Sequence, residues 1–274
     1  MLLTADSTVD LFIKTWENDA KWLPYCLLGF DNYAKDFRQL ILLTDKGYRP
    51  DISTSNLPVK VIETDFTEAG YIESPPFRGI TGEGEVVERA PRGPGYYWQQ
   101  ALKMSWPEFS DADAVAIYDT DTIAWSEFSF LDLTLDGRPY WRIRSYQPEN
   151  ANSIWRDCVT SFLGHKVNTN YMPRLPFPSR LFTRESTEGF AAQIKKRYGK
   201  SLVDFFRPSS DGPTLSEYSL FGAYLDKINR HGYLIVDSDL VDTGIILPDL
   251  PLKHYWSWGG LDPLFEDIEQ MIQS

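Results

Sequence analysis

The run Val115-Ala116-Ile117-Tyr118-Asp119-Thr120-Asp121-Thr122 is the stretch of the chain that decides the fold. A short apolar segment, typical of a buried strand, ends abruptly in two aspartates one residue apart. Two unpaired carboxylates inside a strand would lose their hydration at a large cost in free energy. We therefore place Asp119 and Asp121 at the carboxyl end of a strand, where an α/β sheet opens into a crevice.

The spacing of these two aspartates also predicts a chemistry. Carboxylates held so close together repel each other, and a divalent cation is the usual remedy. Mg²⁺ and Mn²⁺ take oxygen ligands and commonly bridge carboxylates to substrate phosphates. Asp119 and Asp121 therefore predict metal-assisted chemistry on a phosphate-bearing substrate. A turn in which the aspartates bond the local backbone is the alternative.

The composition limits the class of protein. The chain has 274 residues, 42% of them hydrophobic, which suffices for one large domain or two closely packed ones. Its net charge of −12 argues against nucleic acid as a partner, because binding the phosphate backbone normally needs a basic face. Arg138, Arg142 and Arg144 alternate along a strand-like segment and could share one side of it. A solvated sheet face is the simpler interpretation of that alternation.

The two cysteines, Cys26 and Cys158, supply neither a disulfide framework nor a zinc site. Cys26 lies in an apolar helical pattern and is predicted to be in the core. The first ten residues lack the basic and apolar pattern of a signal peptide, and no run of 18 apolar residues spans a membrane. We expect a cytoplasmic protein without a transmembrane segment, with peripheral membrane contact left open.

Hydrophobic periodicity predicts the order of the elements. Strands are expected at 9–15, 39–44, 59–64, 139–145 and 233–236 and at the apolar run that begins at Val115 and ends at the two aspartates, and helices at 20–34, 96–106, 152–163, 184–198, 216–229 and 263–272. Residues 66–95 are rich in glycine, proline and charge and are interpreted as a long functional loop, while the prolines of 172–180 exclude a helix there. This order predicts the α/β class, built on a largely parallel sheet.

Several polar residues are candidates for chemistry. Glu217, which opens a predicted helix, is either a general base or a residue that favours the helix dipole, and Asp211 is the competing base. His254 could complete a carboxylate metal site or belong to an aromatic core cluster. Gln99 and Gln100 share a helix face with Lys103, which either points into a phosphate crevice or lies on a solvated surface.

Taken in chain order, these pieces resemble the GT-A-fold, nucleotide-sugar-dependent glycosyltransferases, and within them an uncharacterised bacterial branch. The residues that carry the resemblance are Leu11-Phe12-Ile13-Lys14-Thr15, Gln99-Gln100-Ala101-Leu102-Lys103, Tyr118-Asp119-Thr120-Asp121-Thr122, Pro176-Phe177-Pro178, Phe182-Thr183-Arg184, Ser216-Glu217-Tyr218 and His254-Tyr255-Trp256. The loop from Phe66 to Gly95 matches no known pattern, so the sugar and the acceptor stay open.

The resemblance implies a GT-A-like, Rossmann-type mixed sheet flanked by helices in a single domain, 1–274. About residues 1–125 would bind the nucleotide sugar, and about residues 126–274 would form the acceptor-binding half. The implied reaction moves a sugar from a nucleotide diphosphate sugar, with a UDP-sugar favoured, to a hydroxyl of a glycan or glycolipid.

The resemblance also implies roles for residues. Asp119 and Asp121, with His254 as a further ligand, would hold Mn²⁺ or Mg²⁺ on the diphosphate. In an inverting mechanism Glu217 would deprotonate the acceptor, and as an exposed carboxylate it would already be ionised at pH 7. A retaining mechanism needs no such base. The implied donor-binding residues are Lys14, Thr15 and Asp45 around the nucleoside, and Gln100 and Lys103 at the ribose, phosphate or sugar.

Two other functions compete with this one. A haloacid-dehalogenase-like phosphatase would use Asp119 as its nucleophile, and Tyr233-Leu234-Ile235-Val236-Asp237-Ser238-Asp239 imitates the later acidic motif of that family. Against it, that family's nucleophile normally lies near the N-terminus, whereas two or three strands precede Asp119. A non-catalytic calcium-binding module is the third function, although calcium prefers more oxygens than one Asp-X-Asp supplies.

Overall fold

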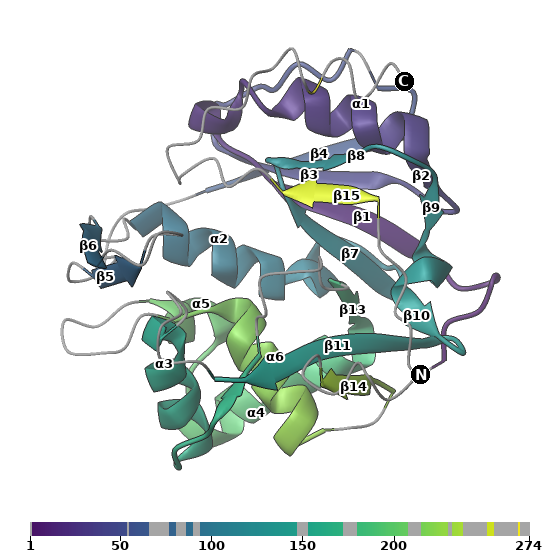
Figure 1. The fold of residues 1–274 in the computed structure, drawn as a ribbon. Helices are drawn as coiled ribbons and strands as arrows, with labels where there is room; N and C mark the ends of the chain where they lie inside the picture. Colours follow the sequence, from purple (N-terminus) through teal and green to yellow (C-terminus); the bar gives the residue numbers. More distant parts are fainter. Residues whose placement is uncertain are drawn as a thin grey trace.

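The computed structural model describes residues 2–53, 55–65, 77–80, 86–89, 94–146, 153–171, 180–207, 215–229, 232–237, 251–254 and 268. Its main sheet has five strands in the order β13-β7-β1-β3-β4 (Figure 1). Their bounds are Val9–Lys14 for β1, Leu40–Asp45 for β3, Val59–Thr64 for β4, Ala114–Asp119 for β7 and Leu181–Thr183 for β13. All of these pairings are parallel except that of β13 with β7, so the predicted mixed α/β sheet is confirmed.

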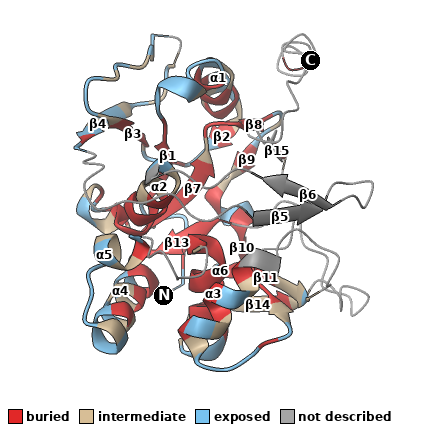
Figure 2. Ribbon diagram, turned by 90° about the vertical axis from the view of Figure 1, so that its left-hand side faces the viewer, coloured by how far each residue is buried: buried red, intermediate tan, exposed pale blue. Residues whose placement is uncertain are grey.

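Helices cover both faces of this sheet, which explains the continuous apolar runs of its central strands. Leu11 and Ile13 of β1 join the core under α1, Leu23–Tyr33, whereas Phe12 joins the core under α2, Pro94–Met104. Figure 2 shows β1 and β7 buried between these two helices. The edge strand β4 is only half-buried, as its alternating sequence predicts.

A second sheet lies beside the first and is centred on β11, Arg138–Ser145. Strands β10, Thr134–Leu135, and β12, Thr169–Asn170, pair with it antiparallel, and β14, Leu234–Asp237, pairs with it parallel. One face of β11 packs against helices (Figure 1). These helices are α3, Ser153–Leu163, α4, Arg184–Tyr198, and α6, Glu217–Lys227; the short α5, Leu202–Phe206, lies beside α4 and α2.

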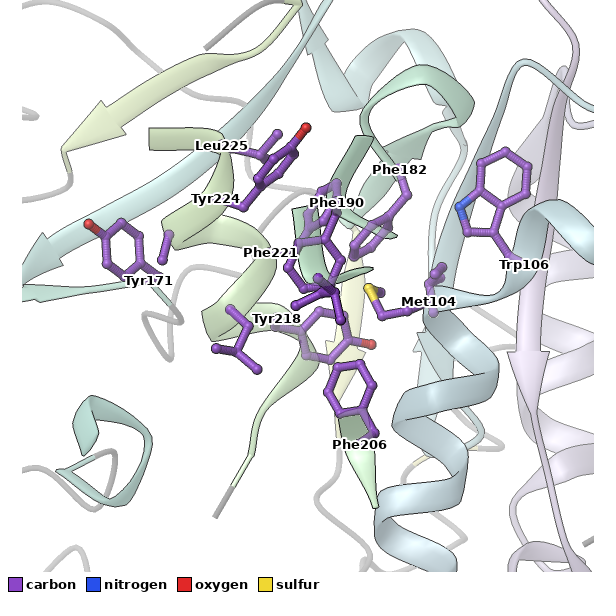
Figure 3. Close-up of a cluster of buried hydrophobic side chains, with 14 of the residues drawn as sticks. Met104, Trp106, Tyr171, Phe182, Phe190, Phe206, Tyr218, Phe221, Tyr224 and Leu225 are labelled. Carbon is purple, nitrogen blue, oxygen red and sulfur yellow. The ribbon is translucent and has the colours of Figure 1, made fainter. Parts of the chain in front are cut away.

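A cluster of buried aromatic side chains packs α6 against both sheets (Figure 3). The rings of Phe182 on β13 and Phe221 on α6 have centroids 4.7 Å apart. A Cβ at Gly222 would lie 2.3 Å from the indole nitrogen of Trp141 on β11, so only glycine lets α6 approach this closely. The first turn of α6 is thereby held near the carboxyl end of β7, where Lys103 contacts both Asp119 and Glu217.

The predicted loop at 66–95 needs correction, because it contains the hairpin of β5, Phe77–Ile80, and β6, Val86–Arg89. Two four-residue strands that pair only with each other leave too short a pattern to detect in the sequence. The sequence did not predict the short strands β10, β12 and β13, nor two further pairs of short strands. These are β2, Ala34–Lys35, with β9, Phe128–Ser129, and β8, Thr122–Ala124, with β15, Leu252–His254.

The remaining described elements are short helices. Some of the predicted elements lie outside the described residues and cannot be compared with the structure. Three short 3₁₀ helices lie at Glu17–Asp19, Trp106–Glu108 and Phe130–Leu133. The other predicted strands and helices are confirmed to within about three residues, apart from the final helix at 263–272. That helix and the proline-rich 172–179 lie outside the described residues, except for helical Ile268. Among the described residues, no helix combines the length and apolar character needed to cross a membrane.

Candidate active site

Three charged residues predicted for the donor site meet at the carboxyl edge of the main sheet. Lys14 on β1 lies in register with Asp119 on β7, and Asp45 ends the neighbouring strand β3. The Lys14 Nζ donates to Asp45 Oδ1 at 2.6 Å and to the Thr15 carbonyl at 2.7 Å. Burial lowers the pKa of Lys14, although the Asp45 charge opposes this shift. The parallel topology therefore gathers these side chains as the sequence predicted.

Asp119 is held by two buried cations. Lys103 donates to its Oδ1, and Arg180 Nη1 donates to its Oδ2 at 2.9 Å. Lys103 comes from α2 and Arg180 from the residue before β13, and both are at most 5% exposed. The Asp119 carboxylate, at the crevice edge, is thus neutralised from two directions.

Lys103 also contacts Glu217, the first residue of α6. Its Nζ lies 3.3 Å from Glu217 Oε1. Burial favours the neutral amine, but the interactions with Asp119, Tyr218 and Glu217 outweigh it and hold the pKa of Lys103 well above its usual value. Lys103 is therefore a buried ammonium between two carboxylates, and the solvated helix face considered for it is wrong.

Glu217 differs from its sequence prediction in exposure. It is only 4% exposed, and burial raises the pKa of its carboxyl, while Lys103 partly opposes the shift. The expectation of an exposed carboxylate with an ordinary pKa is wrong, because the aromatic cluster presses the start of α6 against α2. A carboxylate with a raised pKa in a crevice is a better proton acceptor than a solvated one.

Gln100 acts on the same helix. It is fully buried, and its Oε1 accepts a hydrogen bond of 2.9 Å from the Glu217 backbone N–H. The predicted cap is also present, since Ser216 Oγ accepts from the Ser219 N–H. Gln100 thus positions Glu217, and its contact with a donor stays a prediction.

Sequence analysis missed Arg180. Its guanidinium lies 4.5 Å from the ring centroid of Tyr218, and Nη1 is 3.3 Å from the Tyr218 hydroxyl. Burial lowers the pKa of Arg180, but the interactions with Tyr218 and Asp119 outweigh this effect and raise it above its usual value. Arg180 ends a proline-rich segment with no periodicity, so the only available signal was an arginine just before an apolar strand.

Asp19 was also missed, although it lies close to Asp121. The turn after β1 carries Asp19 toward the loop after β7, and Asp121 is only 4% exposed. Burial raises the pKa of Asp19 to about 6, and repulsion from Asp121 and then Asp119 adds to this effect. A carboxyl group whose pKa is raised by burial and by a neighbouring carboxylate marks a place where a cation would be stabilised.

The other predicted site residues are only partly described. In the β15–β8 pairing, His254 lies opposite Thr122, the residue after Asp121, although its side chain lies outside the description. Thr15 is fully buried beneath the strand ends. Asp211 lies outside the described residues. The roles predicted for these three residues stay predictions.

The acidic residues fit a divalent cation unevenly. Asp121 faces Asp19, and their mutual repulsion would be relieved by a cation between them. Asp119 has both carboxylate oxygens engaged by Lys103 and Arg180. Among the residues that the structure describes, no three His, Cys, Asp or Glu side chains form a metal-binding group. Asp121 and Asp19 are therefore the stronger candidates for metal ligands. Asp119 could join them only by giving up its contact with Lys103 or Arg180.

No protein-family model and no curated protein matches the chain. Among solved structures it is similar to the galactosyltransferase LgtC, solved in complex with donor and acceptor sugar analogs. The likeness covers 96% of this chain and 95% of that one, with a TM-score of 0.48 and 12% identity. A similarity this distant does not assign an activity, so the function must be argued from the site itself.

Proposed function

We propose that this protein is a glycosyltransferase that moves a sugar from a nucleotide diphosphate sugar, with a UDP-sugar favoured, to a hydroxyl of a glycan or glycolipid. The observation that carries the proposal is one continuous chain of ion pairs, Arg180–Asp119–Lys103–Glu217. It joins the strand-end aspartate motif to a buried carboxylate on α6. A leaving-group site and a proton acceptor are thus neighbours in one crevice.

Lys103 and Arg180 suit the charge that develops on the departing diphosphate. Both are buried at the carboxyl edge of β7, where a cation is worth more than in water. Lys14 adds a third ammonium at the end of β1. Mn²⁺ or Mg²⁺, held by Asp121 and Asp19 with Asp119 and His254 as further ligands, would supply Lewis-acid stabilisation of the same oxygens.

Glu217 would accept the proton of the acceptor hydroxyl in an inverting reaction. A general base works best when its pKa is close to the working pH, and the raised pKa of Glu217 is a shift in that direction. The ion pair with Lys103 holds the carboxylate in place. Gln100 and Ser216 fix the helix start that carries it. In a retaining reaction the same carboxylate would serve only to position Lys103.

A phosphatase with Asp119 as nucleophile fits these contacts less well. Arg180 and Lys103 engage both of its carboxylate oxygens. In addition, β14, which ends at Asp237, pairs with β11 in the second sheet and not with the sheet that carries Asp119. Asp237, the first aspartate of that motif, therefore lies on a different sheet from the candidate nucleophile.

The proposal is tested by calorimetric titration of UDP and GDP into the protein, with and without Mn²⁺. Binding that needs both Mn²⁺ and Asp121 is expected, so Asp121→Ala should abolish it. Asp111→Ala is the matched control, because Asp111 is an exposed aspartate just before the amino end of β7. Failure of both nucleotides to bind the wild type would overturn the proposal, as would trapping of a phosphoaspartate mimic at Asp119 with beryllium fluoride.

A further inference from the structure

Two arginines on β11 lie outside the site described above. Arg142 and Arg144 are two residues apart, so they project from the same face of the strand, with Cα atoms roughly 7 Å apart. Trp141 and Ile143 project from the other face, into the core under the helices. The solvated surface predicted for the arginine face is wrong at Arg142, which is only 3% exposed, whereas Arg138 is exposed as expected.

The burial of Arg142 is not balanced by a partner within the described residues. The Nε atoms of Arg142 and Arg144 are both buried without a hydrogen-bond acceptor there. Among the described side chains, Arg142 contacts the Tyr140 ring, whose centroid is 5.9 Å from its Cζ, a long cation–π contact. A guanidinium taken out of water without an anion is costly, and arginine is a side chain suited to grip carboxylate or phosphate oxygens in pairs.

The surroundings of the two arginines favour an external anion over an internal one. Val236 lies opposite Arg142 in the β14 pairing and forms an apolar floor with Tyr140. Asp237, the nearest acidic residue on β14, pairs with Ile143 and therefore belongs to the opposite face. Across from Arg144 on β12 lies Asn170, a buried amide that adds polar character to the same face.

This face leads toward the candidate active site. Tyr140 begins the row that Arg142 and Arg144 continue, and its phenol lies within electrostatic reach of Tyr118. Tyr118 immediately precedes Asp119 on β7. The residues that we assign to the donor and its metal lie on the main sheet, in the turns at its carboxyl edge, on α2 or on β15, whereas both arginines lie on the second sheet. An anion bound by them would therefore belong to the other substrate.

We infer that Arg142 and Arg144 form an anion subsite that binds a carboxylate or phosphate group of the acceptor. The inference rests on the proposed glycosyltransferase function and narrows its acceptor to an acidic one, such as a sugar acid or a phosphate-bearing glycan or lipid. Neutral glycans could accept hydrogen bonds through their hydroxyl groups but would bring no negative charge to balance the two guanidinium groups.

The test follows the arginine Nε–H signals of the full chain by NMR, with Arg142 and Arg144 assigned by substitution. Inorganic phosphate and glucuronate are the anionic probes, and glucose is the neutral control. Saturable shifts of both signals with either anion, and none with glucose, are expected. Arg144→Gln should weaken anion binding about tenfold or more, whereas Arg138→Gln, a change at the exposed arginine of the same row, should alter it less than about twofold.

The variants keep the test independent of folding. Arg144 is only half-buried, so Arg144→Gln should fold even if Arg142→Gln does not. Arg142→Lys keeps the positive charge but removes the paired N–H donors of the guanidinium group. Absence of any saturable shift in the wild type, or an equal loss in Arg138→Gln, overturns the inference.

UDP in the same experiment separates the two proposals. If UDP moves the Arg142 signal and glucuronate does not, the subsite belongs to the donor and the acceptor assignment is wrong. If UDP binds through Asp121 and leaves the arginine signals unchanged while glucuronate shifts them, the result supports both the glycosyltransferase function and the acceptor subsite. If neither UDP nor GDP binds, the proposed function fails, and the assignment to an acceptor falls with it.

Discussion

The two ends of the main sheet both bury carboxylates, but they do so differently. At the amino end of β1, Asp10 accepts two bonds of 2.8 Å from Arg38, one of 2.6 Å from Ser110 and one of 3.2 Å from Gln39. At the carboxyl end, burial and then the Asp121 charge raise the pKa of Asp19, and burial raises that of Glu217 despite Lys103. The carboxylate at the amino end is fully hydrogen-bonded within the protein. The carboxylates at the carboxyl end carry unfavourable electrostatic interactions that a bound ligand could relieve. Such imbalance is typical of functional sites.

The largest effect should come from Lys103→Met, which removes the cation between Asp119 and Glu217. We expect a loss of about 3 to 4 kcal/mol in the free energy of unfolding at pH 8. Without Lys103 the folded-state pKa of Glu217 rises further, so the folded state binds more protons than the unfolded state and stability falls as pH rises. Urea denaturation at pH 5 and pH 8 should therefore show a smaller loss at pH 5.

The matched control for Lys103 is Lys46→Met. Lys46 pairs with Asp65 on the protein surface, where both side chains are about two-thirds exposed. We expect this change to cost at most about 0.5 kcal/mol at either pH. An equal cost for the two lysine variants would remove the distinction between a buried crevice pair and a surface pair.

Glu217→Gln should lower the kcat for release of UDP from a UDP-sugar about a hundredfold or more, because it removes the proton acceptor but keeps the shape. Stability should hold, since a buried carboxylate with a raised pKa is replaced by a neutral amide. In the wild type, kcat should increase with pH as Glu217 loses its proton, at a pH above the ordinary glutamate range. Steady-state rates across a pH series provide the measurement.

Glu185→Gln is the control for Glu217, because Glu185 lies in the first turn of α4, outside the crevice. It shares the favourable interaction with a helix N-terminus but has no place in the proposed chemistry. Unchanged kcat in both variants would exclude a base at Glu217 and favour a retaining mechanism.

Asp10→Asn tests the opposite end of the sheet. Breaking the ion pair with Arg38, whose side chain is 35% exposed, should cost about 2 to 3 kcal/mol of stability. Affinity for UDP and the rate of its release should stay within about twofold of the wild type. A large loss of nucleotide affinity without loss of stability would mean that the two ends are not separate in function.

Asp19→Asn should have the smallest and most pH-dependent effect. Because folding raises the pKa of Asp19 to about 6, its ionised form destabilises the folded state above that pH and has no such effect well below the ordinary aspartate pKa. The variant should gain about 1 to 2 kcal/mol at pH 8 and nothing near pH 3, after allowance for partial exposure. Thermal melts supply the comparison, and an equal gain at both pH values would contradict the assignment.

Manganese sharpens the Asp19 prediction. A cation between Asp19 and Asp121 would remove their repulsion, so Mn²⁺ should raise the melting temperature of the wild type at pH 8 more than that of Asp19→Asn. Equal responses would place the cation elsewhere.

The sequence by itself determined the strands and the edge of the sheet that carries the site. Apolar runs bounded by polar residues specify β1, β3 and β7, because only buried strands covered on both faces need such runs. Parallel strands bring their carboxyl ends to one edge, and Lys14, Asp45 and Asp119, which the family resemblance assigned to the donor site, lie at that edge. Local capping chemistry likewise marked the start of α6 at Ser216.

Tertiary structure alone decided which charges meet and which are buried. Arg180 and Asp19 come from segments without periodicity, and their neighbours lie on strands and helices far along the chain. Glu217 changed from an expected surface carboxylate to a buried one because Gly222 allows α6 to pack directly on Trp141. Sequence patterns report the period of an element and the face that it buries. The pairing of charges across 100 residues depends on packing that no local pattern encodes.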